Sequence, residues 1–273
     1  MEEVRLDTLL VQRRLVESQQ KAQGLILAGQ VLVDGHPVDK PGRRIPESAE
    51  VTIREGLRYV SRGGIKLEHA LDRFDIDVSG MIAADVGAST GGFTDCLLQR
   101  GARKVYAIDV GYGQLAWKLR QDPRVVVLER TNVRYLETLP EPVDLVTVDV
   151  SFISLELVLP QVERLLRPEG EIVSLIKPQF EAGRDQVDKG GVVKEPGIHR
   201  TVLEKVIGLA EREQLRIRGL TPSPVRGPAG NVEFFIHLSR DQRLASISIE
   251  EALDACLSEA VGIGQRSEAQ ACE

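Results

Sequence analysis

The sequence contains few of the residues that build disulfide frameworks or zinc sites. Its 273 residues include three cysteines and four histidines. Cys96, Cys256 and Cys272 are too widely spaced for a disulfide framework or a zinc motif, so we expect reduced thiols. The histidines form no ligand cluster, and the sequence therefore predicts no metal site (His36, His69, His199 and His237).

A membrane-spanning run and an export signal are also missing from the sequence. No apolar run approaches the roughly 20 residues that cross a bilayer. The N-terminus, MEEVRLDTLL, lacks the basic and then apolar order of a signal peptide. Hydrophobic content of 42% and charged content of 28% are ordinary for a soluble globular protein. We therefore expect a cytoplasmic monomer with no membrane partner.

An excess of basic residues, the usual mark of a nucleic-acid binder, is absent as well. The net charge is −6. Residues 1–59 carry nine basic and nine acidic residues, whereas residues 240–273 carry three basic and seven acidic. Because acid is partly segregated to the C-terminus, local basic faces remain available. Composition thus neither demands nor excludes RNA.

The first 58 residues are typical of a small αβ unit. RLDTLLVQRRLV has apolar residues at helical spacing, and Ser18 caps a second predicted helix that stops at Gly29. Asp34-Gly35 marks the turn of a hairpin in VLVDGHPVD, and KPGRRIPESAEVTI adds a further strand. Residues 59–62 are expected to form a linker.

Residues 63–240 alternate between strands and helices, which predicts an α/β fold with a doubly wound sheet. The predicted strands are MIAADVG, KVYAIDV, VVVLER, DLVTVDVSF and EIVSLIKPQF. LELVLPQVERLLRP is expected to be a helix, and RIRGLTPSPV with NVEFFIHLS an antiparallel hairpin. Residues 241–273 form an acidic helical tail.

A glycine-rich loop, DVGASTGGFTD, separates the first of these strands from its helix. Glycines let the backbone approach a ligand, and Asp109 ends the next strand about 20 residues further on, where a carboxylate grips ribose hydroxyls. An acidic loop favours a sulfonium and repels a pyrophosphate, so Asp85 favours S-adenosylmethionine over NAD. The candidate cofactor residues are Asp85, Gly87, Ala88, Ser89, Thr90, Gly91, Gly92, Phe93, Asp109, Asn132 and Asp149.

The residues near this loop indicate which atom accepts the methyl group. Asp149-Val150-Ser151-Phe152 is not the Asn-Pro-Pro-aromatic sequence of many base-nitrogen methyltransferases, and no cysteine is placed as the nucleophile for carbon methylation. The candidate catalytic residues are Lys66, Asp149, Lys177 and Glu233. A partly desolvated lysine can take the proton of a ribose hydroxyl, or a charged lysine can stabilise the forming alkoxide. A ribose hydroxyl is therefore the expected acceptor.

The residues above resemble known families. Lys66, Asp149, Lys177 and Glu233 match the tetrad of FtsJ-type ribose 2′-O-methyltransferases. SRGGIKL, DVGASTGGFTD, DVSFISL, KPQFE and GNVEFF, with nearly the whole chain, resemble the TlyA family of rRNA cytidine-2′-O-methyltransferases, long labelled haemolysins. The resemblance implies a Rossmann-like class I methyltransferase sheet that uses S-adenosylmethionine. It also implies an N-terminal S4-like domain and ribosomal RNA or subunits as partners.

The resemblance also implies which basic residues contact RNA. The candidates are Arg5, Arg13 and Lys21 in the S4-like domain, and Arg62, Arg130, Arg134 and Arg184 near the cleft mouth. Ser18 is followed by Gln19 where members commonly have arginine, which removes one expected phosphate contact. Arg58-Tyr59-Val60 resembles a hinge that couples RNA docking to the cofactor pocket. Forms with extra terminal helices are associated with modification of both subunits, as the tail here suggests.

Two other functions stay open at this point. The first is a membrane-active haemolysin, which the missing export signal and amphipathic membrane helix disfavour. The second is an assembly factor that binds S-adenosylmethionine and RNA without turnover. Methyl transfer into rRNA would distinguish the enzyme from both.

Overall fold

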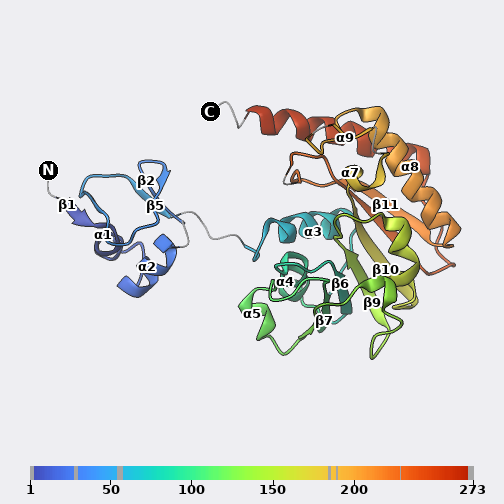
Figure 1. Cartoon of the computed structure of the whole chain (residues 1–273), viewed down its shortest axis with the longest axis horizontal. Helices are drawn as coiled ribbons and strands as arrows, with labels where there is room; N and C mark the ends of the chain where they lie inside the picture. Colours follow the sequence, from blue (N-terminus) through green and yellow to red (C-terminus); the bar gives the residue numbers. More distant parts are fainter. Residues whose placement is uncertain are drawn as a thin grey trace. The chain divides into compact units, whose positions relative to one another are not determined.

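The computed structural model describes residues 3–27, 30–53, 58–183, 186–188, 190–227 and 229–269. The chain forms two compact units, Met1–Arg58 and Tyr59–Glu273, each with its own core (Figure 1). We describe each unit separately. In the described ranges no helix is both long and apolar enough to cross a membrane.

The first unit packs two helices on short antiparallel strands. Helices α1 (Leu6–Gln12) and α2 (Gln19–Leu27) bury a leucine- and isoleucine-rich core. Strand β1 (Glu3–Arg5) pairs with β4 (Arg44–Pro46), and β2 (Val31–Val33) lies between β3 (His36–Pro37) and β5 (Val51–Ile53).

The predicted helix cap and the predicted hairpin turn of this unit both form. The Ser18 Oγ accepts a hydrogen bond from the backbone N–H of Lys21, as a helix cap does. Asp34 and Gly35 have φ of 50° and 78°, which is the left-handed conformation that a type I′ hairpin turn requires. The predicted helix stop at Gly29 lies outside the described residues.

The second unit is built on a seven-stranded sheet of order β11-β12-β10-β9-β6-β7-β8. Its strands are β6 (Ile82–Val86), β7 (Lys104–Ile108), β8 (Val125–Leu128), β9 (Val143–Val148), β10 (Leu166–Ile176), β11 (Arg216–Pro222) and β12 (Phe234–Ser239). Strand β12 is antiparallel to both of its neighbours, which confirms the predicted hairpin. The chain reverses its direction across the sheet between β6 and β9, and ligands bind at such switch points.

Helices cover both faces of this sheet. Helices α3 (Arg62–Arg73), α4 (Gly92–Gln99) and α5 (Trp117–Arg120) share one hydrophobic core with alternate strand residues such as Ala83 and Val105. Helices α6 (Leu159–Glu163), α8 (Pro196–Arg212) and α9 (Ile249–Ala269) share the other core with Ala84 and Tyr106. Period-two alternation along buried strands therefore supplies both cores.

The structure differs from the predicted helix over residues 155–168. It forms a single 3₁₀ turn (Leu155–Leu157) and the short α6, and β10 already begins at Leu166. Leu166 pairs with Val143 of β9 and Pro168 cannot continue a helix, so the chain joins the sheet early.

The segment predicted as a linker, residues 59–62, belongs to the second unit. Tyr59 is 1% exposed in the core that α3 and α4 share, and the Ser61 side chain caps α3 by accepting from Gly63 N–H. The C-terminal α9 lies beside α8 and buries Leu253 and Cys256 against the sheet (Figure 1).

Candidate active site

The glycine-rich loop between β6 and α4 has two positions that only glycine fits. Gly87 and Gly91 have φ of 87° and 95°. A Cβ on Gly87 would lie 2.4 Å from the Asp149 carbonyl oxygen, and one on Gly91 would lie 2.3 Å from a Leu119 methyl group. The loop is therefore packed directly onto the end of β9 and onto α5.

The sequence led us to expect that Asp85 faces the cofactor, but its side chain lies inside the protein instead. Its carboxylate is 0% exposed and accepts hydrogen bonds from the Thr94 backbone N–H at 2.9 Å and the Thr94 hydroxyl at 2.6 Å. Burial raises the pKa of the Asp85 carboxyl to about 7. Asp85 lines neither cavity described below, so its part in the site is to hold the first turn of α4.

A cavity of about 450 Å³ opens at the carboxyl ends of β6, β7 and β9. Apolar residues line it, among them Ile108, Val133 and Val158. Asp109 and Asn132 supply polar groups, and the Asp109 carboxylate is fixed by hydrogen bonds from Ser89 N–H at 2.8 Å and Gly111 N–H at 2.6 Å. An apolar slot with a few fixed polar groups suits a nucleoside.

A second cavity of about 210 Å³ lies between the first turn of α3 and the glycine-rich loop. It shares Gly87, Ser89 and Asp149 with the larger cavity, so the two adjoin. Its walls include Ser61, Arg62, Gly63, Lys66, Ala88, Thr90, Gly92 and Phe93. The smaller cavity has a larger share of polar groups than the larger one, among them Ser61, Lys66 and Asp149, and suits an amino-acid tail. Gly91, also a predicted cofactor residue, packs on Leu115 and Leu119 instead of lining either cavity.

The four predicted catalytic residues form two ion pairs. Lys177 Nζ lies 2.6 Å from Asp149 Oδ1, and Lys66 Nζ lies 2.5 Å from Glu233 Oε2. Asp149 and Lys66 both line the smaller cavity, so the pairs converge there.

Strand register explains why these pairs form. Parallel pairing of β9 with β10 places Asp149 and Lys177 just beyond the same edge of the sheet. Ile176 pairs with Phe234, so the adjacent residues Lys177 and Glu233 flank that edge too.

The two ion pairs differ in burial. The side chains of Lys66 and Glu233 are 10% and 1% exposed, whereas those of Lys177 and Asp149 are 11% and 23% exposed. Only the second pair includes a carboxylate that borders both cavities. The Asp149–Lys177 pair is therefore the one best placed to act on a bound substrate.

The basic residues predicted to contact RNA have different surroundings. Arg5 pairs with the buried Asp7 and holds the pKa of that carboxyl well below its usual range. Arg13 donates to the carbonyls of Ala49 and Glu47, so both arginines are used inside the first unit. Lys21 makes only a loose pair, 3.7 Å from Glu17.

In the second unit two of these arginines lie on aromatic rings. Arg130 lies over the ring of Tyr112 at 4.3 Å and Arg134 over that of Tyr135 at 5.2 Å. Arg62 lines the smaller cavity, and Arg184 lies outside the described residues.

One residue of the site escaped the sequence reasoning. Phe152 is 91% exposed at φ 62°, borders the larger cavity, and packs on Phe180 with ring centroids 5.0 Å apart. Aromatic residues make up only 4% of the sequence, so a phenylalanine three residues after Asp149 was a signal that could have marked it.

The order of the strands, the glycine-rich loop and the two adjoining cavities are those of a class I methyltransferase, the class that uses S-adenosylmethionine. A Listeria monocytogenes structure provisionally named as such an enzyme shares the fold, with a TM-score of 0.51 and 16% identity over 67% of this chain and 100% of that one. The family model for FtsJ-like methyltransferases matches residues 59–240, and that for the S4 domain matches residues 4–51.

Full-length relatives narrow the assignment. The 16S/23S rRNA (cytidine-2′-O)-methyltransferase TlyA of Mycobacterium tuberculosis is 46% identical over 93% of this chain and 97% of that protein. A structure from Streptococcus thermophilus, provisionally named a hemolysin, has a TM-score of 0.77 and 42% identity, covering 98% of this chain and 99% of that one. The chain belongs to the TlyA family of FtsJ-like methyltransferases with an S4 domain.

Proposed function

We propose that the protein transfers a methyl group from S-adenosylmethionine to the ribose 2′-hydroxyl of cytidine in ribosomal RNA. The observation that carries the proposal is the Asp149–Lys177 ion pair, whose carboxylate borders both cavities. A ribose hydroxyl must lose its proton as it becomes a nucleophile, and the amine form of Lys177 would accept that proton, with Asp149 stabilising the ammonium that results.

The two adjoining cavities fit the cofactor. The larger one would hold the nucleoside, with Asp109 at the ribose and Asn132 near the base, and the smaller one the amino-acid end along residues 87–92. S-adenosylmethionine supplies a methyl group on a positively charged sulfur. Asp149 borders both cavities, so its negative charge would lie near that sulfur.

The two ion pairs would then have different roles in the reaction. Lys177 Nζ would accept the hydroxyl proton, and Asp149 would stabilise the resulting ammonium. The Glu233 carboxylate is 1% exposed and lines neither cavity, so the Lys66–Glu233 pair would fix the wall of the smaller cavity beside the reacting atoms.

The RNA would be held by both units. The S4 domain supplies a small αβ surface, and Lys21 is the least constrained of its candidate residues. In the methyltransferase unit, Arg62, Arg130 and Arg134 would contact phosphates. The exposed ring of Phe152 would stack on an unpaired base beside the site.

The family relative named for both 16S and 23S rRNA supports both ribosomal subunits as substrates. An enzyme with such substrates would act where ribosomes are assembled, in the cytoplasm.

The test is transfer of tritiated methyl groups into subunits and naked rRNA from a strain that lacks the gene. We expect label in rRNA, mapped to cytidine ribose by resistance of the adjacent bond to alkali. Lys177→Ala should lower the rate by roughly 10²–10⁴-fold, as loss of a general base does. Lys194→Ala, which removes a 72% exposed lysine, is the matched control. Label in a base, or in no RNA at all, would contradict the proposal.

A further inference from the structure

We propose that Ser151 is a positioning residue for Lys177. It holds the side-chain nitrogen so that the lone pair of the uncharged amine faces the ribose hydroxyl. The inference rests on the proposed function and assigns a role to a residue outside the four ion-paired ones.

Lys177 Nζ has two close polar neighbours. It lies 2.6 Å from Asp149 Oδ1 and donates a hydrogen bond to Ser151 Oγ at 2.8 Å. The Lys177 side chain is only 11% exposed, so its nitrogen is largely shielded from water, whereas Ser151 is exposed at the cavity. Ser151 itself lines the larger cavity together with Asp149.

The valence of an amine gives these two contacts a chemical consequence. Apart from its bond to carbon, the nitrogen has three positions, and in the uncharged amine two carry protons and one carries the lone pair. The hydrogen bond to Ser151 takes up one position and the Asp149 carboxylate lies at ion-pair distance from the nitrogen, which leaves a further position for the lone pair. Without Ser151 the lone pair could take either of two positions on the nitrogen and would have no fixed direction.

The loop that carries Ser151 is tied to the segment that carries Lys177. Ser154 Oγ donates to Glu181 Oε2 and Leu155 N–H to Glu181 Oε1, both at 2.7 Å. Glu181 ends α7 (Pro178–Glu181), the helix that follows Lys177 directly. These bonds join the two chain segments just C-terminal to the Lys177–Ser151 contact.

In the reaction Ser151 would neither gain nor lose a proton. The hydroxyl proton passes to the Lys177 lone pair, the ribose oxygen bonds to the methyl carbon, and the carbon–sulfur electron pair stays on sulfur as a neutral thioether. Ser151 accepts a hydrogen bond from the nitrogen before and after. Its contribution is orientation, and a small misplacement of a reacting group can cost on the order of 10²-fold in rate.

The experiment compares Ser151→Ala, Ser151→Thr and Ser154→Ala with the wild-type full-length protein, using rRNA substrate. Ser151→Ala should lower kcat by about 10- to 100-fold while KM for rRNA and Kd for S-adenosylmethionine stay within about twofold. The pH–rate profile should move to lower pH, because a hydroxyl that accepts from the charged ammonium favours that form and its removal disfavours it. Ser151→Thr keeps the hydroxyl and should restore most of the rate.

Ser154→Ala loosens the bond between the loop and Glu181 but leaves the acceptor of Lys177 in place, so any loss of rate should come without a shift of the pH–rate profile. Thermal melting of each variant identifies any loss of rate that comes from unfolding. A wild-type kcat and pH profile in Ser151→Ala would overturn the inference, as would a failure of threonine to restore activity. A rise in the cofactor Kd with unchanged kcat would overturn it too, assigning Ser151 to cofactor binding. If the wild-type protein itself does not methylate cytidine ribose, the proposed function fails instead.

Discussion

Two buried carboxylates in the methyltransferase unit differ in whether a positively charged side chain lies beside them. Glu233 is compensated by the ammonium of Lys66, whereas Asp85 has only hydroxyl and amide donors near it. A buried carboxylate without a cation favours its protonated form, because transfer of the charge out of water is costly. We therefore expect the titration of Asp85 to make the free energy of unfolding depend on pH.

For Asp85 the sign of the pH effect follows from its two pKa values. The pKa is 3.8 when the chain is unfolded and about 7 when it is folded, so between these values the native state holds a proton that the unfolded state lacks. The stabilisation is fully present below pH 4 and is lost as pH rises through 7.

Asp85→Asn removes this titration while keeping an acceptor for Thr94. Urea unfolding from pH 4.5 to 8 should show the wild type losing about 3 kcal/mol relative to the variant. Parallel stability curves for the two proteins would show that Asp85 does not titrate in this range.

Phe152 is the residue whose loss should affect RNA more than cofactor. Stacking of a base on an aromatic ring contributes about 1–3 kcal/mol, so Phe152→Ala should raise KM for rRNA by roughly tenfold or more. Phe152→Trp should retain the wild-type KM. Leu157→Ala, at an exposed apolar residue that lines neither cavity, is the control. Equal KM values in Phe152→Ala and wild type would remove Phe152 from the RNA surface.

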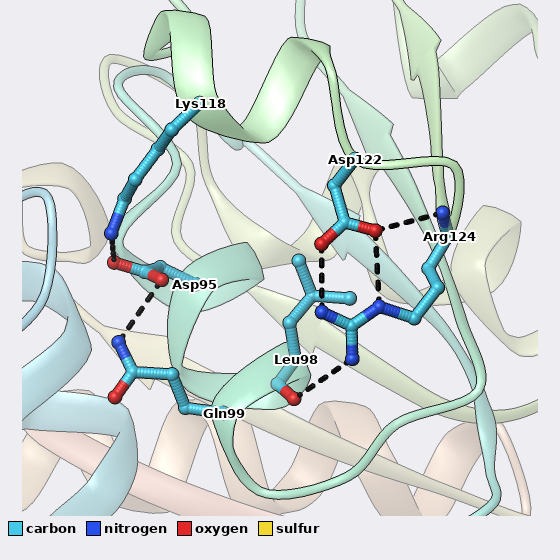
Figure 2. Close-up of polar contacts among 6 residues, drawn as sticks. All are labelled: Asp95, Leu98, Gln99, Lys118, Asp122 and Arg124. Atoms are coloured by element: carbon cyan, nitrogen blue, oxygen red, sulfur yellow. Dashed lines mark hydrogen bonds and ion pairs between the residues drawn. The ribbon is translucent and has the colours of Figure 1, made fainter.

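At the scale of elements, Asp95 joins three segments, two of which, the chain before α3 and α4, wall the smaller cavity. Its carboxylate accepts from the Val60 backbone N–H at 2.8 Å. It also accepts from Lys118 of α5 at 2.9 Å and from Gln99 of α4 at 3.1 Å (Figure 2). Val60 leads into Ser61, whose Oγ lies against Gly92 so closely that a Cβ there would be 2.3 Å away. Asp95 thus sets the first turns of α3 and α4 against each other.

Asp95→Ala should therefore weaken cofactor binding as well as stability. It leaves the Val60 N–H without its acceptor, which costs about 1–3 kcal/mol, and isothermal titration should show a Kd for S-adenosylmethionine raised several-fold. Asp122 offers the matched control, because its pair with Arg124 lies at the surface and spans only two residues (Figure 2). Asp122→Ala should change stability by less than about 1 kcal/mol and leave the Kd unaltered. A wild-type Kd in Asp95→Ala would contradict this role.

The positions of the strands could be predicted from the sequence where a buried apolar run has the length of a strand. The direction in which an individual side chain points could not. Apolar runs ending in charge predicted β9 and β10 and the position of Asp149 and Lys177 at their ends. Asp85 lies inside such a run, and only the packing of Thr94 shows that it points inward. The early start of β10 depends on the distant partner Val143, which no local pattern reveals.

At the scale of the whole molecule, the chain carries two separate compact units that meet in the sequence at residues 58 and 59, and no hydrophobic core of the described residues includes members of both. The first unit has nine basic and nine acidic residues, so the net charge of −6 belongs to the second. We therefore expect RNA recognition to depend on the local placement of basic residues in both units and of aromatic rings in the second unit, with an affinity that depends on the two units being linked.

The junction between the units can be tested with two fragments. Residues 59–273 retain Tyr59 in the core and the Val60–Asp95 hydrogen bond, so this fragment should fold and bind S-adenosylmethionine within about threefold of the full chain. Its affinity for rRNA should fall by on the order of 10²-fold, because one of two linked RNA-binding surfaces is gone.

A fragment of residues 63–273 differs by only four residues but loses a fully buried tyrosine, the α3 cap and part of the cavity wall. Loss of a large buried side chain costs about 3–5 kcal/mol, so this shorter fragment should melt earlier and bind the cofactor poorly. Thermal melting and titration calorimetry compare the two fragments directly. If both melt and bind alike, residues 59–62 act as a linker after all, and the cofactor site does not depend on the chain that enters it.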